Sequence, residues 1–161
     1  MKAIRLAVFD LDGTIIDSEW AHEAAKTAII ASLGGCEIDL GYFTGRSNHV
    51  FWRTVLDKTG REGDVDELVK RQFRFVMDAL KRAGQKESPG LTKLLRYCRD
   101  NGCRTAVCSG SEESFVREIL NYLHVNDLFD VVVTAADAVR LKPAPDVYLA
   151  ALRKSGVDAG Y

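Results

Sequence analysis

The spacing of hydrophobic residues changes twice along this chain of 161 residues. Ile4–Phe9 is a short apolar run, which is typical of a strand that is covered on both faces of a sheet. From Asp17 to Glu87, apolar residues recur at the three- and four-residue spacing of helices. Beyond that stretch, Arg104–Ser109 and Phe129–Ala135 are again strand-like, and helical patterns stand before, between and after them.

This order of elements predicts an α/β fold with a helical insertion. Apolar strands that alternate with helices form right-handed βαβ units, and such units build a parallel sheet. We therefore predict an α/β core from residues 1–16 and 88–161 and a helical cap from residues 17–87. The insertion leaves the first strand at its carboxyl end, where open parallel sheets bind their ligands. It is thus well placed to act as a lid over a site.

Composition and charge argue against several classes of partner. The formal net charge is −1 and the chain has no basic block, which argues against nucleic acid. No stretch approaches the roughly 18 consecutive apolar residues of a membrane span, which argues against a membrane. The cysteines form no C-x-x-C pair, so we interpret them as free thiols of a cytoplasmic protein.

The sequence "DLDGT" follows the first predicted strand and places Asp10 and Asp12 at its carboxyl end. Because strand side chains repeat every second residue, both carboxylates are expected on the same side. An ionised aspartate can attack phosphorus, a protonated neighbour can donate to the leaving oxygen, and Mg²⁺ prefers such oxygen ligands. Gly13 permits a tight turn, and Thr14 offers a hydroxyl and a backbone N–H to a phosphate. A loop with two acidic residues and a helix-capping role explains the same pattern equally well.

The other two predicted strands also end in groups that suit a phosphate. Ser109 can donate its hydroxyl, Gly110 lets a backbone N–H approach closely, and the next helix adds the partial positive charge of its N-terminus. Lys142 stands in a loop stiffened by Pro143 and Pro145, where its ammonium could neutralise phosphoryl charge. A serine-rich helix cap and an exposed lysine are the ordinary alternatives. Three such groups after three successive strands are much less expected by chance than any one of them.

The motifs "DLDGT", "CSGS" and "LKPAPD", in this order and with a helical insertion after the first, closely resemble those of the haloacid dehalogenase superfamily. The resemblance is to the subgroup with a helical cap, which includes β-phosphoglucomutase-like enzymes and sugar-phosphate phosphatases, and it implies a Rossmann-like parallel sheet. It also implies that Asp10 is the nucleophile and a Mg²⁺ ligand. Asp12 would be the general acid and base and would give its backbone carbonyl to the metal. Ser109 and Lys142 would hold the transferring phosphoryl group, and the aspartate at position 12 favours phosphoryl transfer over carbon–halogen cleavage.

One part of the family pattern does not occur before Tyr161. The superfamily completes its Mg²⁺ site with a fourth, acidic motif at the end of a further strand, and here Asp158 is the only acid after Asp146. We therefore expect this chain to be a truncated piece of a longer protein, with weak metal binding and weak or absent activity. We also expect the first strand to expose an edge through which the chain could associate with another copy.

The predicted cap contains candidate substrate-binding residues in the stretch "FTGRSNHVFWR". Arg46 or Arg53 could meet a second phosphate of a substrate, and Trp52 could stack on a sugar or a base. The alternative, which we favour for Trp52, is that it fills the core of the helical bundle; the arginines would then be solvated. Asn48 stands where a β-phosphoglucomutase would have a basic residue, so hydrolysis is favoured over that mutase reaction.

Together these patterns predict a Mg²⁺-dependent phosphatase that hydrolyses small phosphorylated metabolites, such as sugar phosphates, through an aspartyl-phosphate on Asp10. Two alternatives stay open. The same site could carry out a phosphotransferase or phosphomutase reaction of the β-phosphoglucomutase type, which would release no free phosphate. The chain could also be an inactive fragment or a degenerate homologue that only binds.

Overall fold

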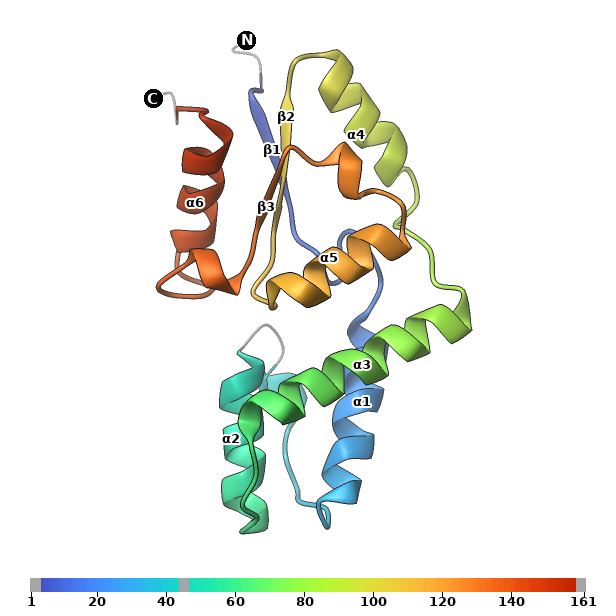
Figure 1. The fold of residues 1–161 in the computed structure, drawn as a ribbon, viewed down its shortest axis with the longest axis vertical. Helices are drawn as coiled ribbons and strands as arrows, with labels where there is room; N and C mark the ends of the chain where they lie inside the picture. The colour runs from blue at the N-terminus through green and yellow to red at the C-terminus, as the bar shows by residue number, and fades with distance from the viewer. Residues whose placement is uncertain (1–3, 44–46, 159–161) are drawn as a thin grey trace. The chain divides into compact units, whose positions relative to one another are not determined.

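The computed structural model describes residues 4–43 and 47–158, which fall into two compact units (Figure 1). The α/β unit lies within residues 1–17 and 86–161, and the helical unit lies within residues 18–85. The boundaries expected from the sequence, after residues 16 and 87, differ from these by one and two residues. Within the described ranges, no helix is both long enough and apolar enough to cross a membrane.

The α/β unit is built on a parallel sheet of three strands in the order β1-β2-β3. Leu6 lies opposite Arg104, and Ala106 lies opposite Val131. This arrangement confirms the predicted α/β class. The strands are β1 (Leu6–Phe9), β2 (Arg104–Cys108) and β3 (Val131–Val133), the helices are α4 (Leu91–Asp100), α5 (Glu113–Tyr122) and α6 (Asp146–Ser155), and the short 3₁₀ turns are η2 (Asn126–Leu128) and η3 (Ala135–Asp137).

Helix α6 covers one face of this sheet. Its buried residues Val147, Ala150 and Ala151 form one apolar cluster with strand residues that include Ala106 and Val133. Helix α4 lies on the other side of the sheet from α6 (Figure 1). The chain therefore packs helices on both faces, so that the ends of the strands, rather than their faces, carry the polar residues discussed below.

Strand β1 departs from the prediction of a strand covered on both faces. Val8 is exposed and the other residues of β1 are half-buried, whereas Thr105–Cys108 of β2 are all buried. In the described sheet, β1 stands at one end and pairs with β2 alone. An exposed edge of this strand was expected from the missing fourth motif, and a strand with a neighbour on one side only also receives less cover.

Strand β3 is shorter than the sequence predicts. The predicted strand extends to Ala135, but sheet pairing ends at Val133. The chain turns there because Asp137 binds back to the strand end: its carboxylate accepts from the Thr134 N–H at 3.0 Å, and its own N–H donates to the Thr134 carbonyl at 3.0 Å. Burial alone would raise the pKa of Asp137, but hydrogen bonds from Lys154 and the Thr134 N–H lower it overall, so this carboxylate stays ionised.

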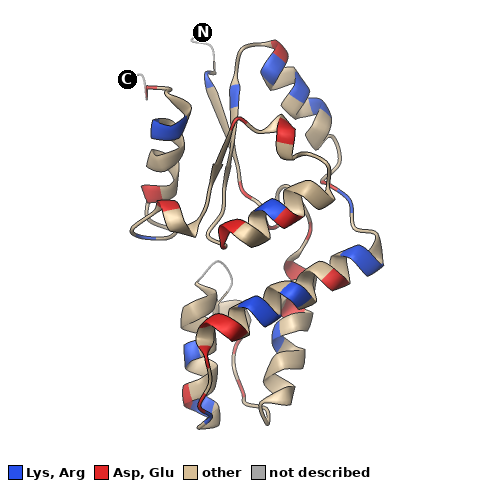
Figure 2. Cartoon of the chain, viewed as in Figure 1, with Lys and Arg blue, Asp and Glu red and all other residues tan. Residues whose placement is uncertain are grey.

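The helical unit contains α1 (Glu19–Ser32), the 3₁₀ turn η1 (Gly41–Phe43), α2 (Asn48–Thr59) and α3 (Val65–Ala83). Asp64 is the N-cap of α3, because its side chain accepts from the N–H groups of Asp66 at 2.8 Å and Glu67 at 3.4 Å. Acidic and basic residues alternate along α3 (Figure 2). Its apolar face, including Phe73 and Leu80, is buried, so α3 is an amphipathic helix that packs on the rest of this unit.

A neutral polar network lies in the core of the helical unit. The Trp52 indole donates to Gln72 Oε1 at 2.7 Å, which fixes the amide orientation because an indole N–H can only donate. Gln72 Nε2 then donates to His22 Nδ1 at 2.9 Å and to Asn48 Oδ1 at 3.3 Å. Trp52 and Gln72 are fully buried. Trp52 is therefore a core residue, in agreement with the favoured alternative, and its ring does not stack on a substrate.

Candidate active site

The loop after β1 is fixed by buried apolar side chains and a tight turn. Leu11, Ile15 and Ile16 are fully buried. The N–H of Gly13 donates to the Ile16 carbonyl at 2.9 Å, and Gly13 takes a φ of 71°, in the left-handed region that favours glycine. Because Leu11 anchors the loop inside the unit, the aspartate on each side of it is kept near the surface, at the carboxyl end of β1.

Asp10 is the more open of the two acids in this loop. Its side chain is 48% exposed, and Oδ1 accepts from the Leu11 N–H at 2.8 Å and faces the Lys142 ammonium at 2.9 Å. Asp12 is half-buried, and its backbone pairs with Ile16 in an isolated bridge. Both acids thus belong to one short, well-fixed loop.

Lys142 brings the third predicted motif to the same place. Its Nζ is 2.9 Å from Asp10 Oδ1 and donates to the Cys108 carbonyl at 2.9 Å. Since Asp10 follows β1 and Cys108 ends β2, the ammonium lies at the carboxyl ends of both strands. The Lys142 side chain is only 22% exposed, and Nζ is 5.6 Å from the centre of the Tyr148 ring. This lysine is held, unlike the solvated lysine of the ordinary alternative.

Ser109 follows β2 directly and is almost fully buried. Its N–H donates to the Val133 carbonyl at 3.0 Å, and its Oγ accepts from the Ser111 N–H at 3.1 Å. Its hydroxyl hydrogen has no acceptor among the residues that the structure describes. Gly110 is exposed, and a Cβ added there would meet no atom within 4 Å. Open space therefore lies in front of the backbone between β2 and α5.

Cys108, whose carbonyl holds Lys142, is not a reactive thiol. Burial raises the pKa of Cys108 from its ordinary value of 9.0 to about 11; the Lys142 charge lowers it, and Asp10 and Asp137 raise it further. The thiol is fully buried and stays protonated at neutral pH, which disfavours a role as a nucleophile. The four cysteines of the chain are free.

The two remaining candidate residues are Thr14 and Arg46. Thr14 is exposed, and its N–H is directed to the Leu11 carbonyl at 3.4 Å. Its hydroxyl is therefore the group that remains for a phosphate. Arg46, the candidate for binding the rest of the substrate, lies outside the described residues.

Sequence reasoning missed the residues that surround Lys142. Arg140 and Asp146 flank it and form an ion pair at 2.9 Å, and Tyr148 lies beside its ammonium. The opposite charges on the two sides of the "LKPAP" segment were the available signal. That signal is weak, because a spacing of six residues in a loop does not by itself bring two side chains together.

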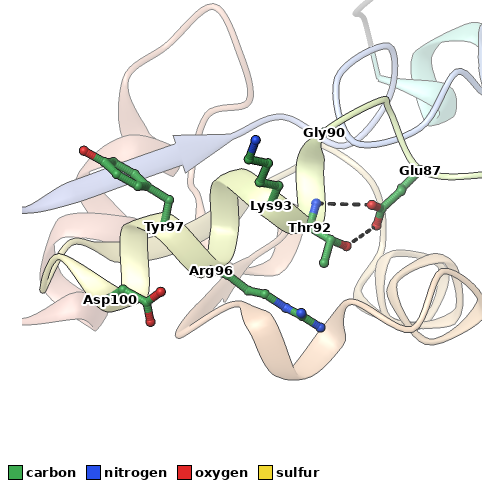
Figure 3. Close-up of a pocket in the computed structure, with 7 residues that line it drawn as sticks. All are labelled: Glu87, Gly90, Thr92, Lys93, Arg96, Tyr97 and Asp100. Carbon is green, nitrogen blue, oxygen red and sulfur yellow. Dashed lines mark hydrogen bonds between the residues drawn. The ribbon is translucent and has the colours of Figure 1, made fainter.

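A separate hollow lies along α4, lined by residues between Glu87 and Asp100 (Figure 3). Glu87 accepts from the Thr92 N–H at 3.2 Å and from the Thr92 hydroxyl at 2.7 Å, so its carboxylate serves the first turn of α4. The side chains of Lys93 and Arg96 point away from one another in this view. None of the motif residues lines this hollow, which is an open helix surface and not a second candidate site.

The donor atoms at the end of β1 suit a hard cation. Mg²⁺ prefers oxygen ligands and is usually held by one or two carboxylates together with waters and substrate phosphates. Asp10 and Asp12 supply two such acids within one loop. Within residues 4–43 and 47–158, no group of three or more His, Cys, Asp and Glu side chains could hold a metal. Asp10 and Asp12 could therefore supply only part of the oxygen ligands that Mg²⁺ takes, and the rest would have to come from water or a bound phosphate.

Sequence comparison identifies the class to which this fold and these strand-end residues belong. The family model of the haloacid dehalogenase-like hydrolases matches residues 4–160, so the chain belongs to this family. The chain is 26% identical over 170 residues to hexitol phosphatase B of Escherichia coli K12, covering 98% of the chain and 72% of that protein. It is 29% identical over 160 residues to a phosphoglycolate phosphatase of Pseudomonas putida, covering 95% of the chain and 58% of that protein.

Solved structures show the same fold. CbbY from Rhodobacter sphaeroides, in complex with xylulose-(1,5)bisphosphate, superposes with a TM-score of 0.80 at 21% identity, covering 96% of this chain and 74% of that chain. A β-phosphoglucomutase from Clostridium difficile also has a TM-score of 0.80, at 22% identity, covering 96% and 72%. At these identities the likeness concerns the fold, which is the α/β fold with a parallel sheet predicted from the sequence.

Proposed function

We propose that this protein is a Mg²⁺-dependent phosphatase of small phosphorylated metabolites of the sugar-phosphate kind. The observation that carries the proposal is the 2.9 Å separation between Lys142 Nζ and Asp10 Oδ1. It places a held cation beside a half-exposed carboxylate at the edge of a parallel sheet, where ligands bind. The names of the relatives support the substrate class, since they include a hexitol phosphatase and a phosphoglycolate phosphatase.

The reaction would proceed through two displacements at phosphorus. A carboxylate oxygen of Asp10 attacks the phosphorus, the bond from phosphorus to the ester oxygen breaks, and Asp12 gives its proton to the leaving oxygen. Water then attacks the phosphorus of the aspartyl-phosphate while Asp12 takes a proton from that water. The bond between phosphorus and Asp10 breaks, which releases inorganic phosphate and restores the free carboxylate.

The remaining candidate residues would hold the phosphoryl group during both steps. The Lys142 ammonium would balance its negative charge, as preorganised cations do for charge that develops in a transition state. The Ser109 hydroxyl and the Gly110 N–H would donate to its oxygens, beside the N-terminus of α5. The Thr14 hydroxyl is a further donor from the loop after β1. Single substitutions of these residues can test each proposed role separately.

Asp10 and Asp12 would also hold Mg²⁺, Asp10 through its carboxylate and Asp12 through its backbone carbonyl. When bound, the metal would supply positive charge that reduces the repulsion between these acids and the phosphoryl oxygens. A cytoplasmic location belongs to the same proposal, because free cysteines are typical of reducing compartments.

A phosphate-release screen tests the proposal. The protein expressed from its complete reading frame would be assayed with Mg²⁺ on sugar phosphates, sugar-alcohol phosphates and nucleotides. We expect release from one or more of the sugar phosphates, and its loss in Asp10→Asn. The matched variant Asp100→Asn changes an exposed aspartate of α4 in the same unit and should keep full turnover.

Three results would contradict parts of the proposal. Full turnover by Asp10→Asn would show that this carboxylate is not the nucleophile. No release from any compound by the folded wild type would contradict the phosphatase assignment. Transfer of the phosphoryl group to a second hydroxyl, with no free phosphate, would select the phosphomutase alternative.

A further inference from the structure

The loop that carries Lys142 is closed by a single carboxylate. Arg140 Nη2 donates to Asp146 Oδ1 at 2.9 Å, and Arg140 Nε donates to Asp146 Oδ2 at 3.4 Å. The backbone N–H of Arg140 also donates to Asp146 Oδ2, at 3.0 Å. Three hydrogen bonds thus tie the beginning of the loop to its end, and Lys142 lies between the two tied residues.

Asp146 is the fixed member of this tie. It is the first residue of α6, and the next residue, Val147, is fully buried in the apolar cluster that packs α6 on the sheet. The Asp146 side chain is 17% exposed, whereas that of Arg140 is 70% exposed. The sheet therefore positions α6, α6 positions the carboxylate, and the carboxylate fastens the opposite end of the loop.

The loop has few other internal hydrogen bonds that could fix Lys142. Pro143 and Pro145 have no N–H to donate. Between these tied ends, the described backbone hydrogen bond within the loop runs from the Ala144 N–H to the Leu141 carbonyl, at 3.1 Å. A lysine ammonium stands at the end of a flexible four-carbon stem, so its position depends on how well the backbone beneath it is held.

A purely stabilising role does not account for this pair well. Because the Arg140 side chain is 70% exposed, water screens this ion pair, and such pairs contribute little to the free energy of unfolding. The effect of this pair on the conformation of the loop is larger, because Asp146 accepts two hydrogen bonds from the Arg140 side chain and one from its backbone N–H. The hydrogen bond from Arg140 also lowers the pKa of Asp146 below its ordinary value, so the carboxylate stays charged in mildly acidic solution.

We propose that Arg140 and Asp146 are positioning residues that hold the Lys142 ammonium at the carboxyl ends of β1 and β2. The placement of Lys142 follows from the contacts described above. The consequence for phosphoryl binding rests on the proposed function, so the test has one part that needs no ligand and one part that needs phosphate.

Lysine acetylation followed by peptide mass spectrometry measures the placement without any ligand. A low concentration of an activated acetate ester would be used, and the rate at Lys142 would be divided by the rate at Lys93, an exposed lysine of α4. Asp146→Asn and Arg140→Met should raise this ratio by roughly threefold or more, because the loop opens more often. Arg140→Lys keeps a charged donor but not the bidentate geometry, so its ratio should be intermediate.

The matched controls break a comparable pair elsewhere in the same unit. Arg117 donates to Glu113 at 3.2 Å on α5, and both side chains are exposed. Glu113→Gln and Arg117→Met should leave the ratio unchanged. An unchanged ratio in both Asp146→Asn and Arg140→Met would overturn the proposal, and so would an equal rise in the two control variants.

Inorganic phosphate separates this proposal from the proposed function. If the site binds phosphate, its addition should slow acetylation of Lys142 in the wild type and less so in Asp146→Asn. Variants that raise the ratio while phosphate gives no protection would support the positioning role and count against the proposed function. Protection by phosphate together with an unchanged ratio in the variants would support the function and overturn the positioning role.

Discussion

Each unit of the chain contains a joined pair of polar side chains, and the two pairs stand in opposite settings. In the α/β unit, the charged pair of Asp10 and Lys142 stands at the strand ends, where water reaches both side chains. In the helical unit, the uncharged pair of Gln72 and Trp52 is joined by a hydrogen bond of 2.7 Å and is fully buried. Burial of an ion costs several kcal/mol, whereas a buried amide with its hydrogen bonds made costs little. The charged pair is thus accessible to a ligand, and the neutral pair fixes helix packing.

The largest effect expected from this difference is on turnover in the α/β unit. Lys142→Met should lower kcat/KM by roughly 10²–10³-fold, as for the loss of one preorganised electrostatic group, and should change stability by less than about 1 kcal/mol. Steady-state kinetics and denaturant unfolding measure the two quantities. Lys154→Met breaks the 2.7 Å ion pair with Asp137 and should keep its turnover. Equal losses of kcat/KM in the two variants would contradict a special role for the charge of Lys142 at the site.

The next effect is on stability in the helical unit. Leu80 of α3 is 0% exposed, so Leu80→Ala should lower the free energy of unfolding by about 2–5 kcal/mol. Leu94 of α4 is 47% exposed, and the same change there should cost less than about 1 kcal/mol. Chemical denaturation of both variants makes the comparison. Similar values would mean that the apolar face of α3 is not the core of its unit.

The buried polar network should show a smaller loss. Gln72→Leu leaves the Trp52 N–H without its acceptor and should cost about 1–3 kcal/mol, the penalty of one unsatisfied buried group. Because Trp52→Phe removes the orphaned donor, the double variant should recover part of this loss in a double-mutant cycle. Strict additivity of the two changes would contradict a direct coupling of the two side chains.

The smallest effect concerns pH and brings the comparison back to the α/β unit. The Cys108 thiol has a pKa of about 11 in the folded protein against 9.0 ordinarily, so the unfolded chain loses this proton first as pH rises. The stabilisation of the folded protein by the protonated Cys108 thiol is complete below pH 9.0, and it is lost between pH 9.0 and about pH 11. By the linkage relation, about 1.4 kcal/mol of this stabilisation has been lost near pH 10. The decline in stability over this range should be shallower in Cys108→Ala, and identical slopes would contradict the burial of this thiol.

Local patterns in the sequence predicted local structure well. The helical spacing between Asp17 and Glu87 depends on neighbouring residues, and α3 with its N-cap Asp64 lies within that stretch as a helix. The loop after β1 contains its own signals, a glycine for the turn and an apolar residue between two acids. The buried position of Trp52 agrees with the favoured alternative for this residue.

Features that depend on distant parts of the chain were not visible in the same way. The exposure of Val8 follows from the place of β1 in the sheet, and the early end of β3 follows from the turn that Asp137 holds. The Cys108 carbonyl that accepts from Lys142 has no sequence signal, because every residue carries a carbonyl. The ion pair of Arg140 and Asp146, which closes the loop that carries Lys142, likewise depends on the packing of α6 and not on the spacing of the two residues.

The central claim is that Asp10 becomes phosphorylated beside Lys142, and direct detection of that bond tests it. The protein from its complete reading frame would be mixed with a turned-over phosphate ester and Mg²⁺, quenched in acid within one turnover and digested for peptide mass spectrometry. We predict a phosphoryl group on the peptide that contains Asp10, in smaller amount in Lys142→Met and absent in Asp10→Asn. Rapid turnover with no phosphorylated peptide, or with the phosphoryl group on another residue, would contradict the account.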